Sequence, residues 1–169
     1  LASQIQFYNN ITSSDIHETM IKAASGLISE DKPNYQYVAG RLINYQLRKE
    51  VYGKYEPRKL AQHYGVVKDQ GYYDKALATV YSIEEWDELS AYVKHDRDDY
   101  LTYAAMEQFR GKYLVKNRAT GKIFETPQVA FMLIAMTLFS NYPKDTRIGW
   151  VKDLYDALST FDISLPTPI

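Results

Sequence analysis

The chain has 169 residues, of which 46% are hydrophobic and 24% are charged, values that are ordinary for a folded globular protein. Its formal net charge of -1 gives no electrostatic basis for binding nucleic acid or an anionic membrane. Cysteine is absent, which excludes disulfides, thiolate metal sites and thiol chemistry within these residues. The 16 tyrosines predict helix interfaces in which the ring is buried and the hydroxyl contacts water or a partner. Base stacking or ligand binding is the alternative.

The sequence gives no sign of a membrane segment. The longest apolar run, residues 129–139, is about half of the ~20 residues that a bilayer-spanning helix needs. Residues 1–4 have neither the basic start nor the apolar core of a signal peptide. We therefore expect a cytoplasmic protein, and the missing initiator Met suggests a processed or truncated chain.

Two helices are predicted first, joined as an antiparallel hairpin by a short connection at Pro33. Thr12, Ser13 and Ser14 are candidate N-caps of the first helix. Its expected apolar stripe has helical spacing and consists of Ile16, Met20, Ala23, Ala24, Leu27 and Ile28. The second helix is expected over residues 35–52, with Val38, Leu42 and Tyr45 on its inner face.

Further helices follow. Pro57 is expected in the first turn of a third helix that closes near Gly71, and Asp74 is expected to cap a short fourth one. Ser82 and Glu85 form a capping box at the start of a fifth helix. The inner face of this fifth helix is expected to carry Trp86, Leu89 and Val93.

The charged run at residues 94–99 predicts a junction that leads into a helix ending near Gly111. Within it, residues 95–98 (HDRD) are interpreted as a solvated ion-pair network, with a catalytic cluster as the alternative. The period then changes from helix to strand, and residues 113–124 predict a β-hairpin that turns at residues 119–121.

The helix that starts at Thr126 and Pro127 is apolar on nearly every side, so we expect it to need cover from further protein. A final helix begins at Asp145 or Thr146. Its inner face is expected to carry Ile148, Val151, Tyr155 and Leu158. The alternation of apolar residues after Ser159 predicts a strand over residues 161–169, with no partner nearby, as if the chain were cut where a larger fold begins.

Few residues are candidates for chemistry. None of the three histidines, His17, His63 and His95, has metal-ligand spacing. His17 and Ser13 lie in a first helical turn, where free amides favour phosphate, and Lys49 can supply a countercharge. Ordinary capping and surface roles are the alternative. No Gly-rich phosphate loop or nucleophile elbow occurs, so no catalytic residue and no metal site are predicted.

An ordered set of segments carries a family resemblance that covers essentially the whole chain. The segments are residues 12–19 (TSSDIHET), 21–24 (IKAA), 33–39 (PNYQYVA), 47–49 (LRK), 52–53 (YG), 56–57 (EP), 95–98 (HDRD), 111–115 (GKYLV), 120–121 (TG), 138–143 (LFSNYP) and 165–169 (LPTPI). Together they resemble the N-terminal portion of the large, catalytic subunit of class I ribonucleotide reductase.

The resemblance implies a mainly α fold in three parts. Residues 1–54 resemble the later helices of an ATP-cone, a regulatory domain that senses ATP against dATP. Residues 55–160 resemble an all-helical domain with one hairpin, and residues 161–169 resemble the first strand of a ten-stranded α/β barrel. The barrel itself, which carries the family's redox and radical cysteines, is absent from this sequence.

The resemblance also implies roles for single residues. Ser13, His17 and Lys49 correspond to ATP- or dATP-contacting positions of the cone, and Thr167 corresponds to a contact with the substrate diphosphate. Gln46 departs from relatives that carry His at this position. Because the opening strands and basic loop of the cone are absent, the resemblance implies weak or no nucleotide binding.

The implied activity of the complete assembly is the radical reduction of ribonucleoside diphosphates to 2′-deoxyribonucleoside diphosphates. The implied partners are the barrel-bearing remainder of the subunit, a second large subunit, and a small subunit with a metal-radical centre. This chain is expected to hold no cofactor and to be inactive alone. A nucleotide-sensing transcriptional regulator is an alternative, although such repressors carry zinc-ribbon cysteines. A helical scaffold unrelated to nucleotides is another.

Overall fold

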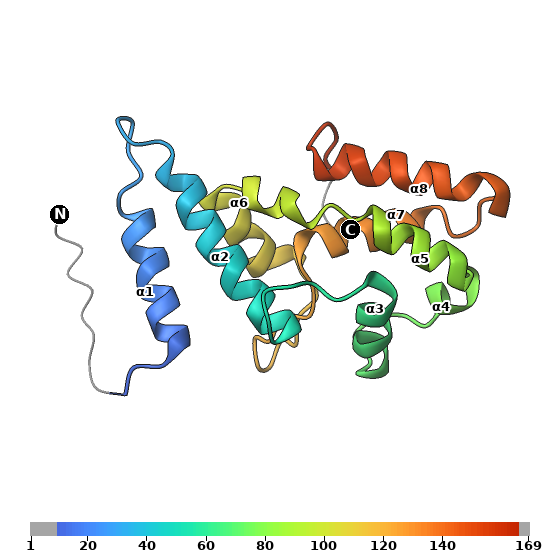
Figure 1. Ribbon diagram of the computed structural model, residues 1–169, viewed down its shortest axis with the longest axis horizontal. Coiled ribbons are helices and arrows are strands. Elements are labelled where there is room, and N and C mark those ends of the chain that lie inside the picture. The colour runs from blue at the N-terminus through green and yellow to red at the C-terminus, as the bar shows by residue number, and fades with distance from the viewer. Residues whose placement is uncertain (1–9, 166–169) are drawn as a thin grey trace.

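The structure is a computed structural model that describes residues 10–165, and within this range it is helical without an extended strand (Figure 1). The elements are α1 (Ser13–Ser25), α2 (Tyr35–Tyr52), α3 (Leu60–Asp69), α4 (Ala76–Val80), α5 (Ile83–Tyr92), the 3-10 helix η1 (His95–Tyr100), α6 (Tyr103–Gln108), the π-helix η2 (Phe109–Tyr113), α7 (Pro127–Leu138) and α8 (Lys144–Ser159). Among these described helices, none is both long and apolar enough to cross a bilayer.

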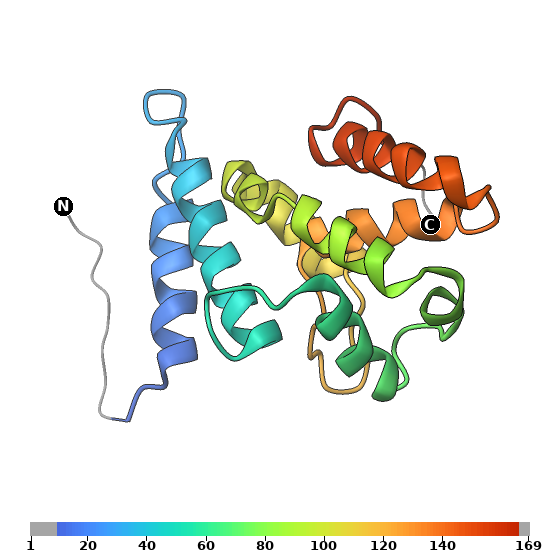
Figure 2. The ribbon, with the colours of Figure 1, turned by 45° about the vertical axis from the view of Figure 1, so that its right-hand side comes forward.

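The α1–α2 hairpin lies at one end of the molecule, as both Figure 1 and Figure 2 show. Of the three predicted caps, Thr12 is the one used, since its hydroxyl accepts from the Asp15 N–H at 3.1 Å. The Asp15 carboxylate accepts in return from the Thr12 N–H at 3.3 Å, which completes a capping box. Helix α2 spans the predicted residues and ends at Gly53, whose φ of 75° closes the last turn.

The predicted inner face of α2 is correct for Leu42, which packs half-buried against the smaller core, and wrong for Val38 and Tyr45. Val38 and Tyr45 are 44% and 38% exposed, whereas Ala39, Ile43 and Leu47 are buried. The reason is that α2 packs with this second stripe against α1, η1 and α6. A Cβ at Gly40 would lie 2.1 Å from the Leu101 carbonyl oxygen, so the absence of a side chain permits this close approach.

The predicted stripe of α1 is correct only in part. Ile21 and Ala24 are buried, whereas Met20, Leu27 and Ile28 are exposed. Both helices thus turn part of their apolar surface away from the rest of the described chain, because the next element covers only one side of each.

Two apolar cores meet at α7. The smaller core joins α1 and α2 to α6 and to the segment that follows it, through Ile21, Ile43, Leu47, Leu101, Met106, Leu114, Ile123 and Ala130. The larger core joins α3, α5, α7 and α8, and its fully buried members include Leu60, Leu89, Val129, Met132, Met136, Val151 and Tyr155. Helix α7 was expected to need cover from further protein, and this is wrong for residues 127–136, which these neighbours bury except for the half-buried Ile134. Leu138 at its end is exposed.

Local start signals were predicted well for two helices and less well for a third. Asp74 caps the turn before α4, where its carboxylate accepts from the Ala76 N–H at 2.7 Å. Ser82 and Glu85 form the expected capping box of α5. Helix α3, however, begins at Leu60 and not at Pro57.

The predicted hairpin is present only as a single antiparallel bridge between Lys116 and Ile123. Two hydrogen bonds join the two arms of this hairpin. They run from the Asn117 N–H to the Lys122 carbonyl and from the Phe124 N–H to the Val115 carbonyl, both at 2.9 Å. Of the predicted strand at residues 161–169, residues 161–163 form a turn and a bend, and residues 164 and 165 have no regular secondary structure. Residues 166–169, including Thr167, lie outside the described part of the chain.

Several tyrosines match the predicted pattern of a buried ring with a bonded hydroxyl. The hydroxyl of Tyr81 donates to the Met136 carbonyl at 2.7 Å, and that of Tyr73 donates to the Glu125 carboxylate at 2.6 Å. Tyr155 donates to Gln128 at 2.7 Å and accepts from the Lys94 N–H at 2.8 Å. These bonds connect segments that are far apart in sequence, because a ring packs inside while its hydroxyl satisfies a polar neighbour.

Candidate functional site

An aromatic and cationic surface lies where α1 meets α2, and we call His17, Tyr45, Lys49 and Tyr55 the aromatic face. The His17 and Tyr45 rings meet edge to face with centroids 5.2 Å apart, and Tyr45 stacks on Tyr55 at 5.5 Å. The Lys49 ammonium lies 5.3 Å from the centroid of the Tyr45 ring. Two of the residues that the resemblance singles out, His17 and Lys49, therefore contact the same ring from two different helices.

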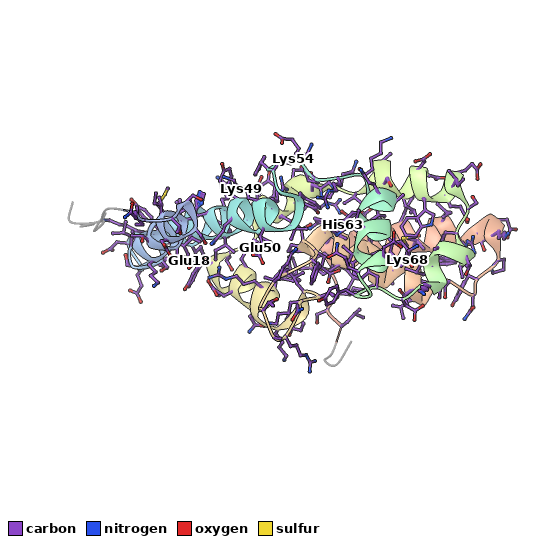
Figure 3. All side chains as sticks on the ribbon, turned by 90° about the horizontal axis from the view of Figure 1, so that it is seen from below. Glu18, Lys49, Glu50, Lys54, His63 and Lys68 are labelled. Atoms are coloured by element: carbon purple, nitrogen blue, oxygen red, sulfur yellow. The ribbon has the colours of Figure 1, made fainter. Side chains whose placement is uncertain are left out.

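Ser13 is the first residue of α1 and lies one helical turn before His17, so both face the same side of this helix. Because Thr12 provides the cap, the exposed Ser13 hydroxyl is not used for capping. The first turn of α1 also presents the positive end of the helix dipole. Figure 3 shows Lys49 on one side of α2, with Lys54 just after the helix on the same side, and Glu50 on the other side.

Gln46 lines a different feature, a groove of about 330 Å³ between α1–α2 and the residues after α6. In this groove the Arg110 guanidinium bridges Glu18 at 3.0 Å and Glu107 at 2.7 Å. Glu50 accepts there from the Ile123 N–H at 2.8 Å. In this groove an ion pair joins α1 to the rest of the chain, and a hydrogen bond to a backbone N–H joins α2 to it.

The predicted solvated ion-pair network at residues 95–98 is wrong for its central carboxylate. Asp98 is 0% exposed, and among residues 10–165 neither of its oxygens has a partner in hydrogen-bonding geometry. Arg97 alone forms a partly exposed ion pair of the expected kind, with Asp156 at 2.6 Å. Asp98 is buried because η1 packs against both α2 and α7 and turns this side chain inward.

We call the polar groups around Asp98 the junction cluster; its members are the buried Asn44, Arg48, Asp98 and Gln128 and the half-buried His95. The Arg48 guanidinium donates to the His95 carbonyl, and the Asn44 amide donates to the Asp99 carboxylate at 2.7 Å. Unpartnered atoms remain on all five members in the described structure. A cluster with so many open donors and acceptors joins α2 to η1 and α7 by polar rather than apolar contacts.

Burial dominates the protonation behaviour of this region. It raises the pKa of Asp98 to about 7, although the Gln128 amide and the Arg48 charge act in the opposite direction. Burial lowers the pKa of His95 to about 4, and the nearby Arg48 charge acts in the same direction. His63, buried between Tyr52 and Tyr73, has its pKa lowered to about 4 for the same main reason.

No catalytic constellation was predicted, and the described residues show no group of three His, Cys, Asp or Glu side chains placed to hold a metal ion. His17 lies on α1 beside the Tyr45 ring, and His63 lies on α3 between the rings of Tyr52 and Tyr73. His95 lies on η1, where its carbonyl accepts from Arg48. The aromatic face and the junction cluster are therefore the two features with the most chemistry in this chain.

Comparison with known proteins shows which proteins the chain resembles. Residues 99–169 match the sequence model of the "Ribonucleotide reductase, all-alpha domain" family. Over all 169 residues the chain is 53% identical to the ribonucleoside-diphosphate reductase 1 subunit alpha of Escherichia coli strain K12. Along its whole length the chain is similar to ribonucleotide reductase alpha subunits, and residues 99–169 match their all-alpha domain.

Other ribonucleotide reductase alpha subunits give the same picture. The chain is 52% identical over its full length to the subunit alpha of Haemophilus influenzae. It is also 47% identical, over 95% of its length, to the subunit alpha of Enterobacteria phage T4. It spans only 22% of the length of the E. coli and H. influenzae proteins and 21% of the phage protein.

The sequence reasoning missed the role of Tyr45 and Tyr55 at the surface. Tyr45 was placed on the inner face of α2, although its spacing of four residues from Lys49 is the signal that puts ring and ammonium on one side of a helix. Tyr55 lies after the end of α2, where helical spacing does not extend, so only the fold brings it to Tyr45.

Proposed function

We propose that this chain supplies the N-terminal part of a ribonucleotide reductase large subunit. The complete assembly would reduce ribonucleoside diphosphates to 2′-deoxyribonucleoside diphosphates by radical chemistry. The observation that carries this proposal is the identity of about half of all residues with ribonucleoside-diphosphate reductase alpha subunits along the whole chain. The partners would be the remaining part of the large subunit, a second large subunit, and a small subunit with a metal-radical centre, in the cytoplasm.

The proposed parts are the three that the sequence resemblance implies. Residues up to about 54 would belong to a nucleotide-sensing cone, residues 55–160 to the all-helical domain, and residues 161–169 to an entry strand of the barrel, with Thr167 at the substrate diphosphate. In the described structure α1 and α2 contribute to the smaller core and α3, α5 and α8 to the larger one, while residues 101–130 of the second part complete the smaller core.

The proposed role of the aromatic face is to contact the phosphates of ATP or dATP, the allosteric effectors. Three features support it: Ser13 and His17 share one side of α1, the positive helix end lies beside them, and Lys49 meets His17 at the Tyr45 ring. No single member of this set is specific for a nucleotide, but together they place several phosphate-binding groups on one surface.

The first prediction concerns binding by the 169-residue chain. We expect ATP to bind weakly in calorimetry, and we expect Lys49→Ala to reduce the association constant about tenfold or more. The reason is that a charge-assisted phosphate contact contributes roughly 1.5–3 kcal/mol. Lys68→Ala is the matched control, since Figure 3 places Lys68 on α3, far from Lys49. Equal losses in the two variants would contradict the assignment of the site.

The second prediction concerns catalysis. The purified chain, supplied with a small subunit and a dithiol reductant, should not convert any ribonucleoside diphosphate, because it contains no cysteine. Turnover should appear when a polypeptide carrying the remaining part of a related alpha subunit is added. Product formation by the chain without that polypeptide, or its absence from the combined mixture, would count against the proposed function.

A further inference from the structure

Arg48 contacts two distinct regions with one guanidinium group. On one side its central carbon lies 4.8 Å from the centroid of the Tyr55 ring, which belongs to the aromatic face. On the other side it donates to the His95 carbonyl within the junction cluster. The residue is only 4% exposed, so both contacts are made at the boundary between surface and interior.

From Arg48 a chain of contacts continues in both directions. Outward, Tyr55 stacks on Tyr45, and Tyr45 contacts His17 and Lys49. Inward, Arg48 bonds the carbonyl of His95, three residues before Asp98 on η1, and both buried Asp98 oxygens have no partner in the described structure. The positive charge of Arg48 also favours the ionised form of this carboxylate. The Nε atom of Arg48 has no hydrogen-bond partner in the described structure. The guanidinium can therefore move without losing a hydrogen bond at Nε.

We propose that Arg48 is a positioning residue that couples the orientation of the Tyr55 ring, and through it the aromatic face, to the charge state of the Asp98 carboxylate. Ionised Asp98 attracts the guanidinium toward the interior, and neutral Asp98 leaves it on the tyrosine ring and the His95 carbonyl. The consequence for nucleotide binding rests on the function proposed above, whereas the coupling itself does not.

The groups that face Asp98 are known for each element packed against it. They are Arg48 and Tyr52 on α2, Asp99 on η1, the neutral Gln128 amide on α7, and Tyr155 on α8. Burial raises the pKa of Tyr155 to about 12 and raises that of Tyr52 further, so both hydroxyls stay protonated at neutral pH. With the Asp98 pKa at about 7, Asp98 is the member whose charge changes near neutrality.

Nuclear magnetic resonance tests the coupling without any nucleotide. The chain carries ¹³C-labelled tyrosine rings and aspartate carboxyl groups, and His17→Gln is present in every sample so that the imidazole beside Tyr45 does not contribute. We expect the Tyr55 ring signal to inflect at the same pH as the Asp98 carboxyl signal. Asp98→Asn should abolish the Tyr55 inflection.

Variants of the linking residue separate positioning from simple structural support. In Arg48→Lys a positive charge remains but the planar group is lost, so Asp98 should still titrate while Tyr55 no longer follows it. Arg41→Lys is the matched control, because Arg41 lies two turns earlier on α2 and donates from Nε to the Asp99 carbonyl at 3.0 Å. This control should retain the Tyr55 response.

The reverse measurement covers the case in which Arg48→Lys does not fold. Coupling is reciprocal, so Tyr55→Leu at the exposed end should move the Asp98 midpoint by about half a pH unit. A Tyr55 signal without inflection in the parent, an inflection that survives Asp98→Asn or Arg48→Lys, or an unmoved midpoint in Tyr55→Leu would each overturn the proposal. Failure of ATP binding with an intact Tyr55 response would instead refute the nucleotide site alone.

Discussion

Replacing Arg147 by methionine is expected to lower the free energy of unfolding by about 3–5 kcal/mol, the usual loss when one partner of a buried ion pair is removed. Arg147 is 2% exposed, and its Nε donates to the Glu85 carboxylate at 2.6 Å, while a second nitrogen bonds the other carboxylate oxygen. It also donates to the Val80 carbonyl at 2.8 Å and lies over the Tyr81 ring at 4.3 Å. Methionine fills similar volume but satisfies none of these groups.

The matched control is Lys152→Met on the same helix. Lys152 forms an ion pair with Glu88 at 2.6 Å, but the Glu88 side chain is half exposed, so its loss should cost less than about 1 kcal/mol. Urea denaturation of both variants measures the difference. If the two losses were similar, burial would not be what makes the Arg147 pair important.

Signals that act within a few residues were readable from the sequence. Thr12, Asp74 and Ser82 each satisfy amides two or three positions ahead, and the structure contains all three of these bonds. Such caps depend on local geometry alone, so no knowledge of the remaining chain is required. The extent of α2 was predicted for the same reason, since a helical period after Pro33 indicates it, and the structure adds Gly53 as the residue that ends it.

Choices that depend on distant neighbours were not readable. In α2 two stripes have helical spacing, and the one containing Ile43 is buried because α6 and η1 approach from that side. The backbone at Leu101 is more than 50 residues away in sequence, yet it decides which face is covered. Helical periodicity shows that a face is apolar, but a partner must be known before one of two such faces can be chosen.

In the candidate site, too, residues marked by local signals were predicted, and a residue placed by tertiary contacts was not. His17 and Ser13 were identified from their place in a helical first turn, and Lys49 from the expected hairpin, and the fold brings these helices together. Asp98 was assigned to a solvated network because charged runs are usually exposed. Its burial against α2 and α7 is a tertiary effect that the run of charges conceals.

The last prediction follows from that burial. In the folded chain the pKa of Asp98 is raised to about 7 from an ordinary value of 3.8, so the folded state holds the proton more tightly than the unfolded state. The contribution of Asp98 to the free energy of unfolding is most favourable below its unfolded-state pKa of 3.8 and is lost as pH rises through about 7. Above about 7 the ionised Asp98 costs about 4 kcal/mol of stability. Asp98→Asn removes this cost while it preserves the shape of the side chain.

We therefore expect the stability gained by Asp98→Asn, relative to the parent, to grow by about 2 kcal/mol between pH 5.5 and pH 8. His63 and His95, with pKa values lowered to about 4, make both proteins less stable as pH falls from about 6.5, and this shared effect cancels in the difference. Asp96→Asn, on the exposed side of the same 3-10 helix, should show almost no change with pH. Urea denaturation across this pH range checks the sign: a gain that shrinks with rising pH would mean that Arg48 stabilises the ionised carboxylate more than burial opposes it.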